Sequence, residues 1–157
     1  MRNKSELLRK RNRVYRKLCQ IFDKANLDED TIRCADIFSD LQADFEGLDG
    51  YSSDGEYARQ TYDLFRLGWE AISYECEDVI LLVLDDYDAS TYQNENFNNF
   101  NLGMFAAYNH ASTEVIQKAT QNKDAMAQVD ETGCSLADLI KEEYETEVFD
   151  YDEEFWG

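Results

Sequence analysis

The segment Tyr57–Asp86, YARQTYDLFRLGWEAISYECEDVILLVLDD, carries the pattern that decides the fold class. Apolar side chains recur in it at alternating steps of three and four residues: Ala58, Tyr62, Phe65, Trp69, Ile72, Cys76, Val79 and Val83. This spacing places them on one face of an α-helix. Ser53 or Asp54 can cap the start, so the pattern predicts one long helix to about Asp86. The run Val79–Leu84 alone would also suit a buried strand, and the sequence leaves that choice open.

Four further amphipathic segments flank this one. We expect helices at about 5–25, 31–46, 97–121 and 135–148, with Ser5 and Ser135 as N-caps of the first and last. The polar stretches 47–55 and 88–96 predict loops. No internal repeat is evident. The predicted fold is therefore all-α, a compact bundle of about five helices followed by an acidic C-terminal tail.

The length of 157 residues, 43% of them hydrophobic, fits one helical domain over 1–157. We expect a basic amphipathic helix at 1–25, an acidic helical body at 26–148 and an acidic aromatic tail at 149–157. The longest apolar run has only six residues, Val79 to Leu84, which is too short to span a bilayer. We also find no signal-peptide pattern and expect a cytoplasmic protein, in the host cytoplasm if a phage encodes it.

The charge is strongly acidic and unevenly distributed. Thirty-four Asp and Glu against 15 Lys and Arg give a net charge of -19. Residues 1–24 hold nine of the basic side chains and only two acidic ones, a net charge of +7, so the rest of the chain carries -26. Self-repulsion at this density weakens a compact state, which suggests that the electrostatic field itself is useful.

Motifs for catalysis and metal binding are missing from the sequence. It contains no nucleophile elbow, no phosphate-binding loop and no dinucleotide-binding turn. The single His110 lies four residues before Glu114 and on one helix face with it, but two ligands do not make a metal site. The four cysteines are widely spaced, with no Cys-x-x-Cys pair, and we expect reduced thiols. We therefore predict a protein that is not an enzyme and binds no metal or cofactor.

Acidic side chains form three groups at helical spacing. The first is Asp36, Asp40 and Asp44; the second is Glu56, Asp63, Glu70 and Glu77, opposite the Phe65 and Trp69 face; the third is Glu142, Glu143, Glu145, Glu147, Asp150, Asp152, Glu153 and Glu154. A solvated face explains any single group. DNA carries one charge per about 1.7 Å of axis, however, and three adjacent stripes with few bases approach that density. Such a surface can occupy the basic groove of a nucleic-acid-binding protein.

Two segments resemble a known class of acidic proteins. Residues 35–39, ADIFS, are similar to a stretch of an anti-restriction DNA mimic, and the acidic, aromatic-bearing segment 142–154 is similar to the ending of that family. The class consists of nucleic-acid-mimicking anti-restriction and anti-CRISPR proteins of phages and mobile elements. The resemblance implies an acidic inhibitor that blocks nucleic-acid access to a host CRISPR effector or restriction enzyme.

Aromatic side chains near the acids would anchor such a partner, because desolvated aromatic residues carry much of the energy of an interface. The candidates are Tyr87, Tyr144, Tyr151 and Trp156. Two other functions stay open: an immunity protein or antitoxin that neutralises a nuclease toxin, and a scaffold or assembly protein. We expect a monomer or a small homo-oligomer that binds no membrane.

The basic first helix departs from the resemblance and has three interpretations. It forms a solvated face or pairs with the acidic body, it contacts nucleic acid such as a guide RNA held by the partner, or it attaches to a membrane surface. For nucleic-acid contact the candidates are Arg9, Lys10, Arg13 and Lys17. Outside residues 1–24 we expect no direct nucleic-acid binding.

Overall fold

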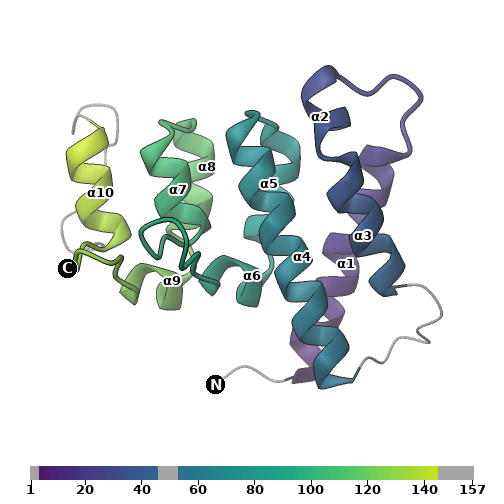
Figure 1. Ribbon diagram of the computed structural model, residues 1–157, viewed down its shortest axis with the longest axis horizontal. Helices are drawn as coiled ribbons and strands as arrows, with labels where there is room; N and C mark the ends of the chain where they lie inside the picture. Colours follow the sequence, from purple (N-terminus) through teal and green to yellow (C-terminus); the bar gives the residue numbers. More distant parts are fainter. Residues whose placement is uncertain (1–3, 46–52, 145–157) are drawn as a thin grey trace.

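The computed structural model describes residues 4–45 and 53–144, which form ten α-helices (Figure 1). Their bounds are α1 Lys4–Phe22, α2 Glu29–Arg33, α3 Ala35–Phe45, α4 Asp54–Ser73, α5 Glu77–Leu84, α6 Tyr87–Thr91, α7 Leu102–Tyr108, α8 Thr113–Ala119, α9 Lys123–Ala127 and α10 Leu136–Glu143. Within these ranges β structure is limited to the isolated bridges Asn94–Phe100 and Val129–Ser135. The all-α prediction is confirmed, with more and shorter helices than the five expected. No helix in the described ranges is long and apolar enough to cross a membrane.

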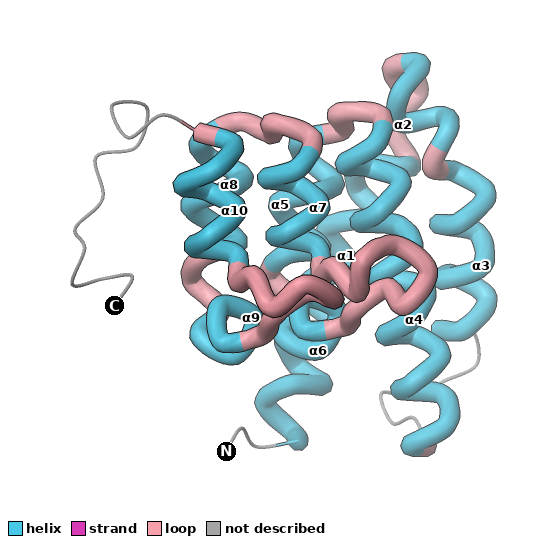
Figure 2. The backbone as a smooth tube through the Cα atoms, turned by 60° about the vertical axis from the view of Figure 1, so that its left-hand side comes forward, coloured by secondary structure: helices cyan, strands magenta, loops and turns pink. Residues whose placement is uncertain are grey.

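The long helices stand side by side in two rows (Figures 1 and 2). One row contains α3, α4, α7 and α10, and the other contains α1, α5 and α8. The short helices α6 and α9 lie at one end of the rows, and α2 lies at the other (Figure 1). Each long helix therefore packs on its neighbours in a stack, which is the organisation of helical repeat proteins.

Cap residues decide where several helices begin. Ser53 and Ser135 cap α4 and α10 with reciprocal capping boxes, as predicted. Ser5 lies inside α1, so its prediction as a cap is wrong. The helix predicted at 31–46 is two helices joined at Cys34, and the polar stretch predicted as a loop at 88–96 begins with helix α6.

A tight turn divides the long helix predicted at 57–86 into α4 and α5. At this turn Glu75 adopts a left-handed φ of 58°, and the Cys76 N–H donates to the Ala71 carbonyl at 2.8 Å. This is a Schellman C-cap, which usually has glycine in the left-handed position. The prediction of one continuous helix is wrong because the three- and four-residue spacing persists across the turn. Val79–Leu84 is helical.

The helix predicted at 97–121 is divided in the same way, into α7 and α8. His110 has a φ of 56°, and the Ala111 N–H donates to the Ala106 carbonyl at 3.0 Å. Ser112 then caps the start of α8. Both turns therefore use the same motif with a non-glycine residue, and each reverses the chain into a helix hairpin.

The chain from α4 to α10 repeats itself, although no repeat was evident in the sequence. Leu67, Leu102 and Leu136 are separated by 35 and 34 residues, and Asp86 and Asn122 cap the short helices α6 and α9 in equivalent places. The two β-bridges close the loops that follow α6 and α9. Two antiparallel helices and then a hairpin-like loop is the order of elements found in ankyrin-type repeats.

Glycine allows neighbouring units to pack closely. A Cβ placed on Gly68 would lie 2.8 Å from a methyl group of Val83 and 2.9 Å from one of Leu102. The equivalent Cβ on Gly103 would lie 2.9 Å from a methyl group of Leu136. Contacts this short do not occur between relaxed carbon atoms, so a side chain at either position would force these methyl groups or their helices to shift.

A buried ion pair connects α1 to the start of α6. The fully buried Arg11 donates to Asp86 twice, at 2.9 Å from Nε and 2.8 Å from Nη2, and its Nη1 donates to the Tyr57 carbonyl at 3.0 Å. The guanidinium also lies 3.9 Å from the centre of the Tyr57 ring. Asp86 in turn caps α6 by accepting from the Ala89 N–H at 2.9 Å. A charged residue can lie on the otherwise apolar face of α1 because Asp86 pairs with Arg11 in the interior.

Candidate functional site

The rows of helices place several turns along one edge of the molecule, the upper edge in Figure 1. The segment leading into α2, the α4–α5 turn, the α7–α8 turn and the end of α10 all lie there (Figure 1). We name their carboxylates the acidic edge: Asp23, Asp28, Glu29, Asp30, Glu75, Glu77, Asp78, Glu114, Glu142 and Glu143. All of them are exposed except Glu143, which is half-buried.

The acidic edge has a charge density close to that of a nucleic-acid strand. Four neighbouring helix positions span roughly 30 Å at a helix spacing of about 8–10 Å, which gives one carboxylate per about 3 Å. Phosphates follow one another at about 3.4 Å along one strand of DNA. In the described part of the chain Lys24, Arg33 and Lys141 also lie at this edge. They lower its net density to about one charge per 4 Å on the same spacing.

Helix dipoles explain part of this gathering of acids. Helices α2, α5 and α8 begin at this edge, and the acidic residues of their first turns are Glu29, Asp30, Glu77, Asp78 and Glu114. A negative side chain near a helix N-terminus contributes about 0.3–1 kcal/mol. Helix stability therefore explains the position of half of the carboxylates of the acidic edge without any partner. It does not explain the position of the other half.

A cavity of about 400 Å³ opens between the two turns of the acidic edge, with Glu75, Glu77 and His110 among its walls. His110 Nε2 lies 3.0 Å from Oε2 of Glu143. The predicted His110–Glu114 pair on one helix face is wrong, because the left-handed conformation of His110 ends α7 and Glu114 belongs to α8. Within 4–45 and 53–144 no three metal-ligating side chains come together.

The first predicted stripe is divided between the surface and the interior. Asp36 and Asp40 are exposed on α3, and Asp40 accepts a hydrogen bond from Arg66 at 3.2 Å. The side chain of Asp44 is only 10% exposed. Burial raises the pKa of Asp44 to about 7, and the neighbouring Asp63 carboxyl adds to the rise. The placement of Asp44 on an exposed acidic face is therefore wrong, because packing of α3 on α4 buries it.

The second predicted stripe does not form a common face. Glu56 closes the capping box of α4, and Asp63 is buried with its carboxylate 2.9 Å from Arg66. Glu70 lines a groove described below, and Glu77 belongs to α5 and the acidic edge. The four residues were predicted on one helix, opposite its aromatic face. That arrangement is wrong because the helix ends at the α4–α5 turn and its middle is buried against α3.

The third group and the aromatic anchors are only partly described. Glu142 and Glu143 lie on the acidic edge. Tyr144 is half-buried, and its hydroxyl donates to the Ala111 carbonyl at 2.6 Å. Tyr87 is half-buried at the start of α6, away from that edge. The following residues lie outside the described ranges: Glu145, Glu147, Asp150, Tyr151, Asp152, Glu153, Glu154 and Trp156.

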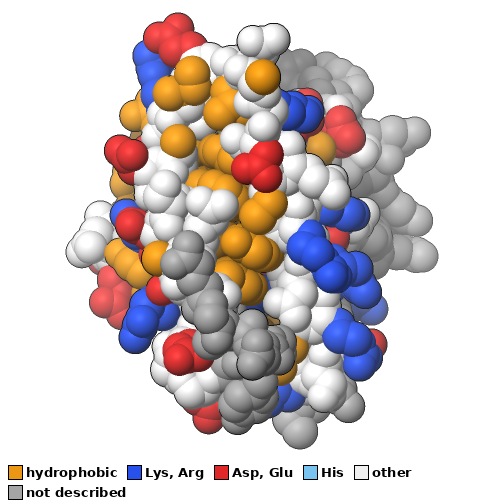
Figure 3. Space-filling view, turned by 90° about the vertical axis from the view of Figure 1, so that its right-hand side faces the viewer, with side chains coloured by type: hydrophobic (Ala, Val, Ile, Leu, Met, Phe, Trp, Pro, Cys, Tyr) orange, Lys and Arg blue, Asp and Glu red, His pale blue; other side chains and the backbone are white. Residues whose placement is uncertain are grey.

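The basic helix α1 pairs with carboxylates at the C-terminal end of α5, away from the acidic edge. Lys10 lies 3.8 Å from Asp85, next to the buried Arg11 pair, which agrees with the interpretation that α1 pairs with the acidic body. Arg9, Arg13 and Lys17 are exposed, and no described carboxylate lies within ion-pair distance of them. Figure 3 looks onto the end formed by α1 and α3, where Lys and Arg side chains gather beside an apolar stripe.

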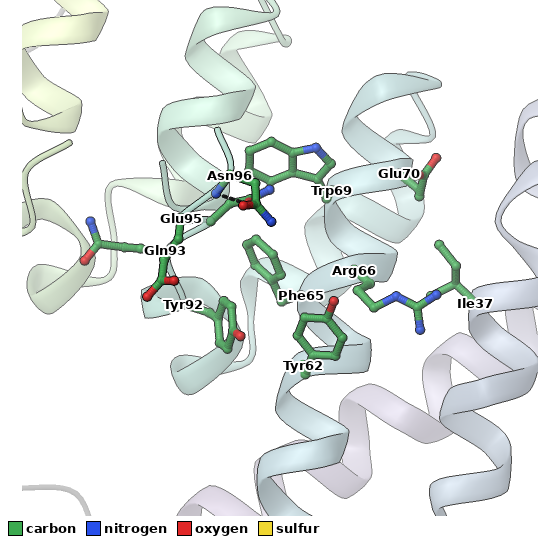
Figure 4. Close-up of a pocket in the computed structure, with 11 residues that line it drawn as sticks. Ile37, Tyr62, Phe65, Arg66, Trp69, Glu70, Tyr92, Gln93, Glu95 and Asn96 are labelled. Carbon is green, nitrogen blue, oxygen red and sulfur yellow. Dashed lines mark hydrogen bonds between the residues drawn. The ribbon is translucent and has the colours of Figure 1, made fainter. Parts of the chain in front are cut away.

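Sequence reasoning missed an aromatic groove along α4. Its cavity has a volume of about 660 Å³ and lies between α4, α3 and the loop after α6 (Figure 4). Tyr62, Phe65 and Trp69 of α4 line it together with Tyr92 of the loop. The sequence placed the three α4 residues on a core face. Tyr62 is nevertheless 46% exposed and Tyr92 37% exposed, because the row of helices is open on this side.

The loop that forms one wall of the groove is firmly held. The Asn94 N–H donates to the Phe100 carbonyl at 2.8 Å, which closes the loop. Between these residues Phe97 packs edge-on against Trp69 with ring centres 5.5 Å apart. Trp69 itself stacks on Phe105 of α7 at 3.6 Å. The groove is therefore largely formed before any ligand arrives.

Two of the four cysteines are neighbours in the core. Cys34 and Cys76 are buried, and the Thr31 hydroxyl lies 3.0 Å from the Cys76 sulfur. A hydrogen bond with Cys34 is the main cause that lowers the pKa of Cys76 to about 7, and the same bond and burial raise the pKa of Cys34. This thiol pair joins the start of α3 to the α4–α5 turn.

Comparison with known proteins adds no relative. No protein-family model matches the chain, and neither the curated proteins nor the solved structures contain a significant match. The similarity in the order of elements to ankyrin-type repeats therefore concerns architecture alone.

Proposed function

We propose that this protein is a non-enzymatic inhibitor that uses its acidic edge to occupy the basic nucleic-acid-binding surface of another protein. The density of carboxylates along that edge carries the proposal, because it is close to the density of phosphates along one strand. A basic cleft binds phosphate mainly through positive side chains that do not read sequence. The same Lys and Arg groups can therefore bind carboxylates fixed at a similar spacing.

The rigidity of the edge supports the proposal further. The carboxylates stand on helix ends and tight turns whose backbone is hydrogen-bonded. Fixed charges lose less conformational entropy on binding than charges on a free chain. On the resemblance noted in the sequence, the partner class that we propose is a host defence enzyme, either a CRISPR effector or a restriction enzyme.

Charge reversal tests the proposal directly. The test variant is Glu75→Lys, Asp78→Lys and Glu114→Lys combined, all at exposed positions of the acidic edge. The matched control is Glu6→Lys, Asp124→Lys and Glu131→Lys combined, which changes the net charge equally at exposed positions elsewhere. Both triple variants include first-turn acids, so helix-dipole effects are similar.

The partner is first captured from host lysate with the unmodified protein and identified by mass spectrometry. We expect unmodified protein and nucleic acid to compete for the partner, with an affinity that falls steeply as salt rises. The edge variant should bind at least about tenfold more weakly than the control variant, or about 1.4 kcal/mol. Simultaneous binding of nucleic acid and protein to the partner, or equal affinity of the two variants, would refute the proposal.

A further inference from the structure

The aromatic groove along α4 exposes part of two tyrosine rings, Tyr62 and Tyr92, and the Arg66 guanidinium lies 5.7 Å from the centre of the Tyr62 ring. Tyr62 and Tyr92 lie with ring centres 5.7 Å apart at an angle of 52°, and Phe65 lies 4.6 Å from Tyr92 (Figure 4). These rings therefore pack on one another, and because Phe65 is only 4% exposed, the accessible ring surface is that of Tyr62 and Tyr92. Exposed tyrosines in a groove are typical of binding sites, because burying an aromatic ring against a ligand contributes much binding free energy.

The charges around the groove favour a cation. Glu70 and Glu95 are the carboxylates among its lining residues. Arg66 is the positive residue of the same lining, but its Nη1 lies 2.9 Å from Asp63 and 3.2 Å from Asp40, which compensate its charge. The groove therefore combines two carboxylates among its lining residues with exposed tyrosine rings, whose π faces attract cations.

We propose that this groove binds the guanidinium group of an arginine carried by an extended segment of the partner. A planar guanidinium stacks on aromatic faces and pairs with carboxylates at its edge, so it matches both features of the groove. An ammonium group would gain the charge interaction but not the stacking. The inference rests on the proposed function for the positive charge of the partner, and it uses a different face from the acidic edge.

The experiment uses the single tryptophan of the groove as a reporter. The chain has two tryptophans, so Trp156→Phe in the full-length protein leaves Trp69 alone. The probe is a short peptide of alternating glycine and arginine, and the matched peptide replaces arginine by citrulline, which has the same shape without the charge. We expect the arginine peptide to change Trp69 fluorescence saturably and to bind at least about tenfold more tightly than the citrulline peptide.

Two substitutions locate the binding in the groove. Tyr62→Ala and Tyr92→Ala remove side chains that are more than a third exposed, so the fold should survive, and far-UV circular dichroism checks this. Each should weaken the arginine peptide at least about fivefold. Tyr108→Ala removes a similarly exposed tyrosine outside the groove lining and should leave the affinity for the arginine peptide unchanged. Tyr92→Leu serves as a second variant if Tyr92→Ala unfolds.

The outcomes separate this inference from the proposed function. Equal binding of the arginine and citrulline peptides, or full binding by Tyr62→Ala and Tyr92→Ala, would overturn the arginine site. The acidic-edge proposal would stand if charge reversal there still weakened the natural partner. If peptide binding is lost in the tyrosine variants but kept in the acidic-edge variant, the arginine site is supported, whether or not the acidic edge binds the natural partner.

Discussion

Replacing Arg11 by methionine should destabilise the protein more than any substitution of an exposed basic residue. Methionine keeps the length and apolar character of the side chain and removes the guanidinium. Asp86, which is 3% exposed, then loses both of its charged hydrogen bonds and keeps only the Ala89 N–H. The Tyr57 carbonyl also loses its Arg11 donor at 3.0 Å. An unpaired carboxylate remains in the interior.

The structure allows the size of this effect to be worked out. Removing one partner of a buried ion pair costs about 3–5 kcal/mol, because the other charge stays desolvated. For a chain of this length each kcal/mol corresponds to roughly 2–4 °C, so Arg11→Met should lower the melting temperature by about 6–20 °C. Whole domains have only about 5–15 kcal/mol of stability, and the loss is therefore a large part of the total.

Urea denaturation followed by far-UV circular dichroism measures the change, in a double-mutant cycle with Asp86→Asn. Asparagine at position 86 can still cap α6, so this variant isolates the ion pair. The double variant should be less destabilised than the sum of the single ones. Arg13→Met, at an exposed position of the same helix, should cost no more than about 0.5 kcal/mol. A loss below about 1 kcal/mol for Arg11→Met would refute the buried-pair interpretation.

Three further predictions concern titration, packing and thiols. The pKa of Asp44 is raised to about 7, so its contribution to the free energy of unfolding is complete below the ordinary pKa of an aspartate and is lost as the pH rises to about 7. Asp44→Asn should therefore remove this decrease in the urea midpoint with pH, whereas Asp36→Asn should keep it. Equal pH dependence of the midpoint in the two variants would contradict the prediction. Gly103→Val should cost about 1–3 kcal/mol in thermal melts because its side chain meets Leu136. A Cβ at Gly55 would meet only the Ser53 hydroxyl, at 4.0 Å, so Gly55→Val is the control, and equal melting temperatures of the two variants would contradict the prediction. Thiol titration of the denatured protein without reductant should find all four cysteines free, and elemental analysis should find no stoichiometric zinc; fewer thiols or bound zinc would show the prediction to be wrong.

The helical state of the chain was predictable because it depends on local spacing. Apolar residues at three- and four-residue steps bury one face of a helix whatever the tertiary arrangement. The same rule decides Val79–Leu84, where the surrounding series favours a helix over the strand that the run alone allows. Ser53 and Ser135 were recognisable as caps because a side-chain oxygen that accepts from the third helical N–H is a local interaction.

The helix hairpins were not predictable from that spacing. A Schellman turn usually shows itself by glycine at its left-handed position, but here Glu75 and His110 occupy it. A left-handed non-glycine residue costs of order 1–2 kcal/mol, which the packing of the hairpin must offset. Missing both turns also hid the repeat, since the repeated unit is defined by them. Ser112, a cap residue inside the predicted helix, was the one available signal.

The candidate site was predictable in composition but not in position. Spacing along α3 correctly put Asp36 and Asp40 on the surface, and it put Asp44 with them because the pattern cannot tell which side α4 will cover. Arg11 could be seen to interrupt an apolar face, but its partner Asp86 is 75 residues away. Exposure of Tyr62 depends on the open side of the row, which only the stacking of units creates.

The acidic edge follows from topology as much as from composition. Stacked hairpins bring the N-termini of α2, α5 and α8 to one side, and acids there stabilise those helices individually. Brought together, the same acids repel one another, and Arg33, 3.2 Å from Glu29 and 4.0 Å from Asp30, offsets only part of that repulsion. Lys10 and Arg11 pair with Asp85 and Asp86 at the other end of α5. A chain under selection for stability alone would gain by placing bases beside the turns, as ordinary surface helices do. Ten carboxylates against Lys24, Arg33 and Lys141 therefore leave a negative field on that edge which folding does not require and which a basic partner can use.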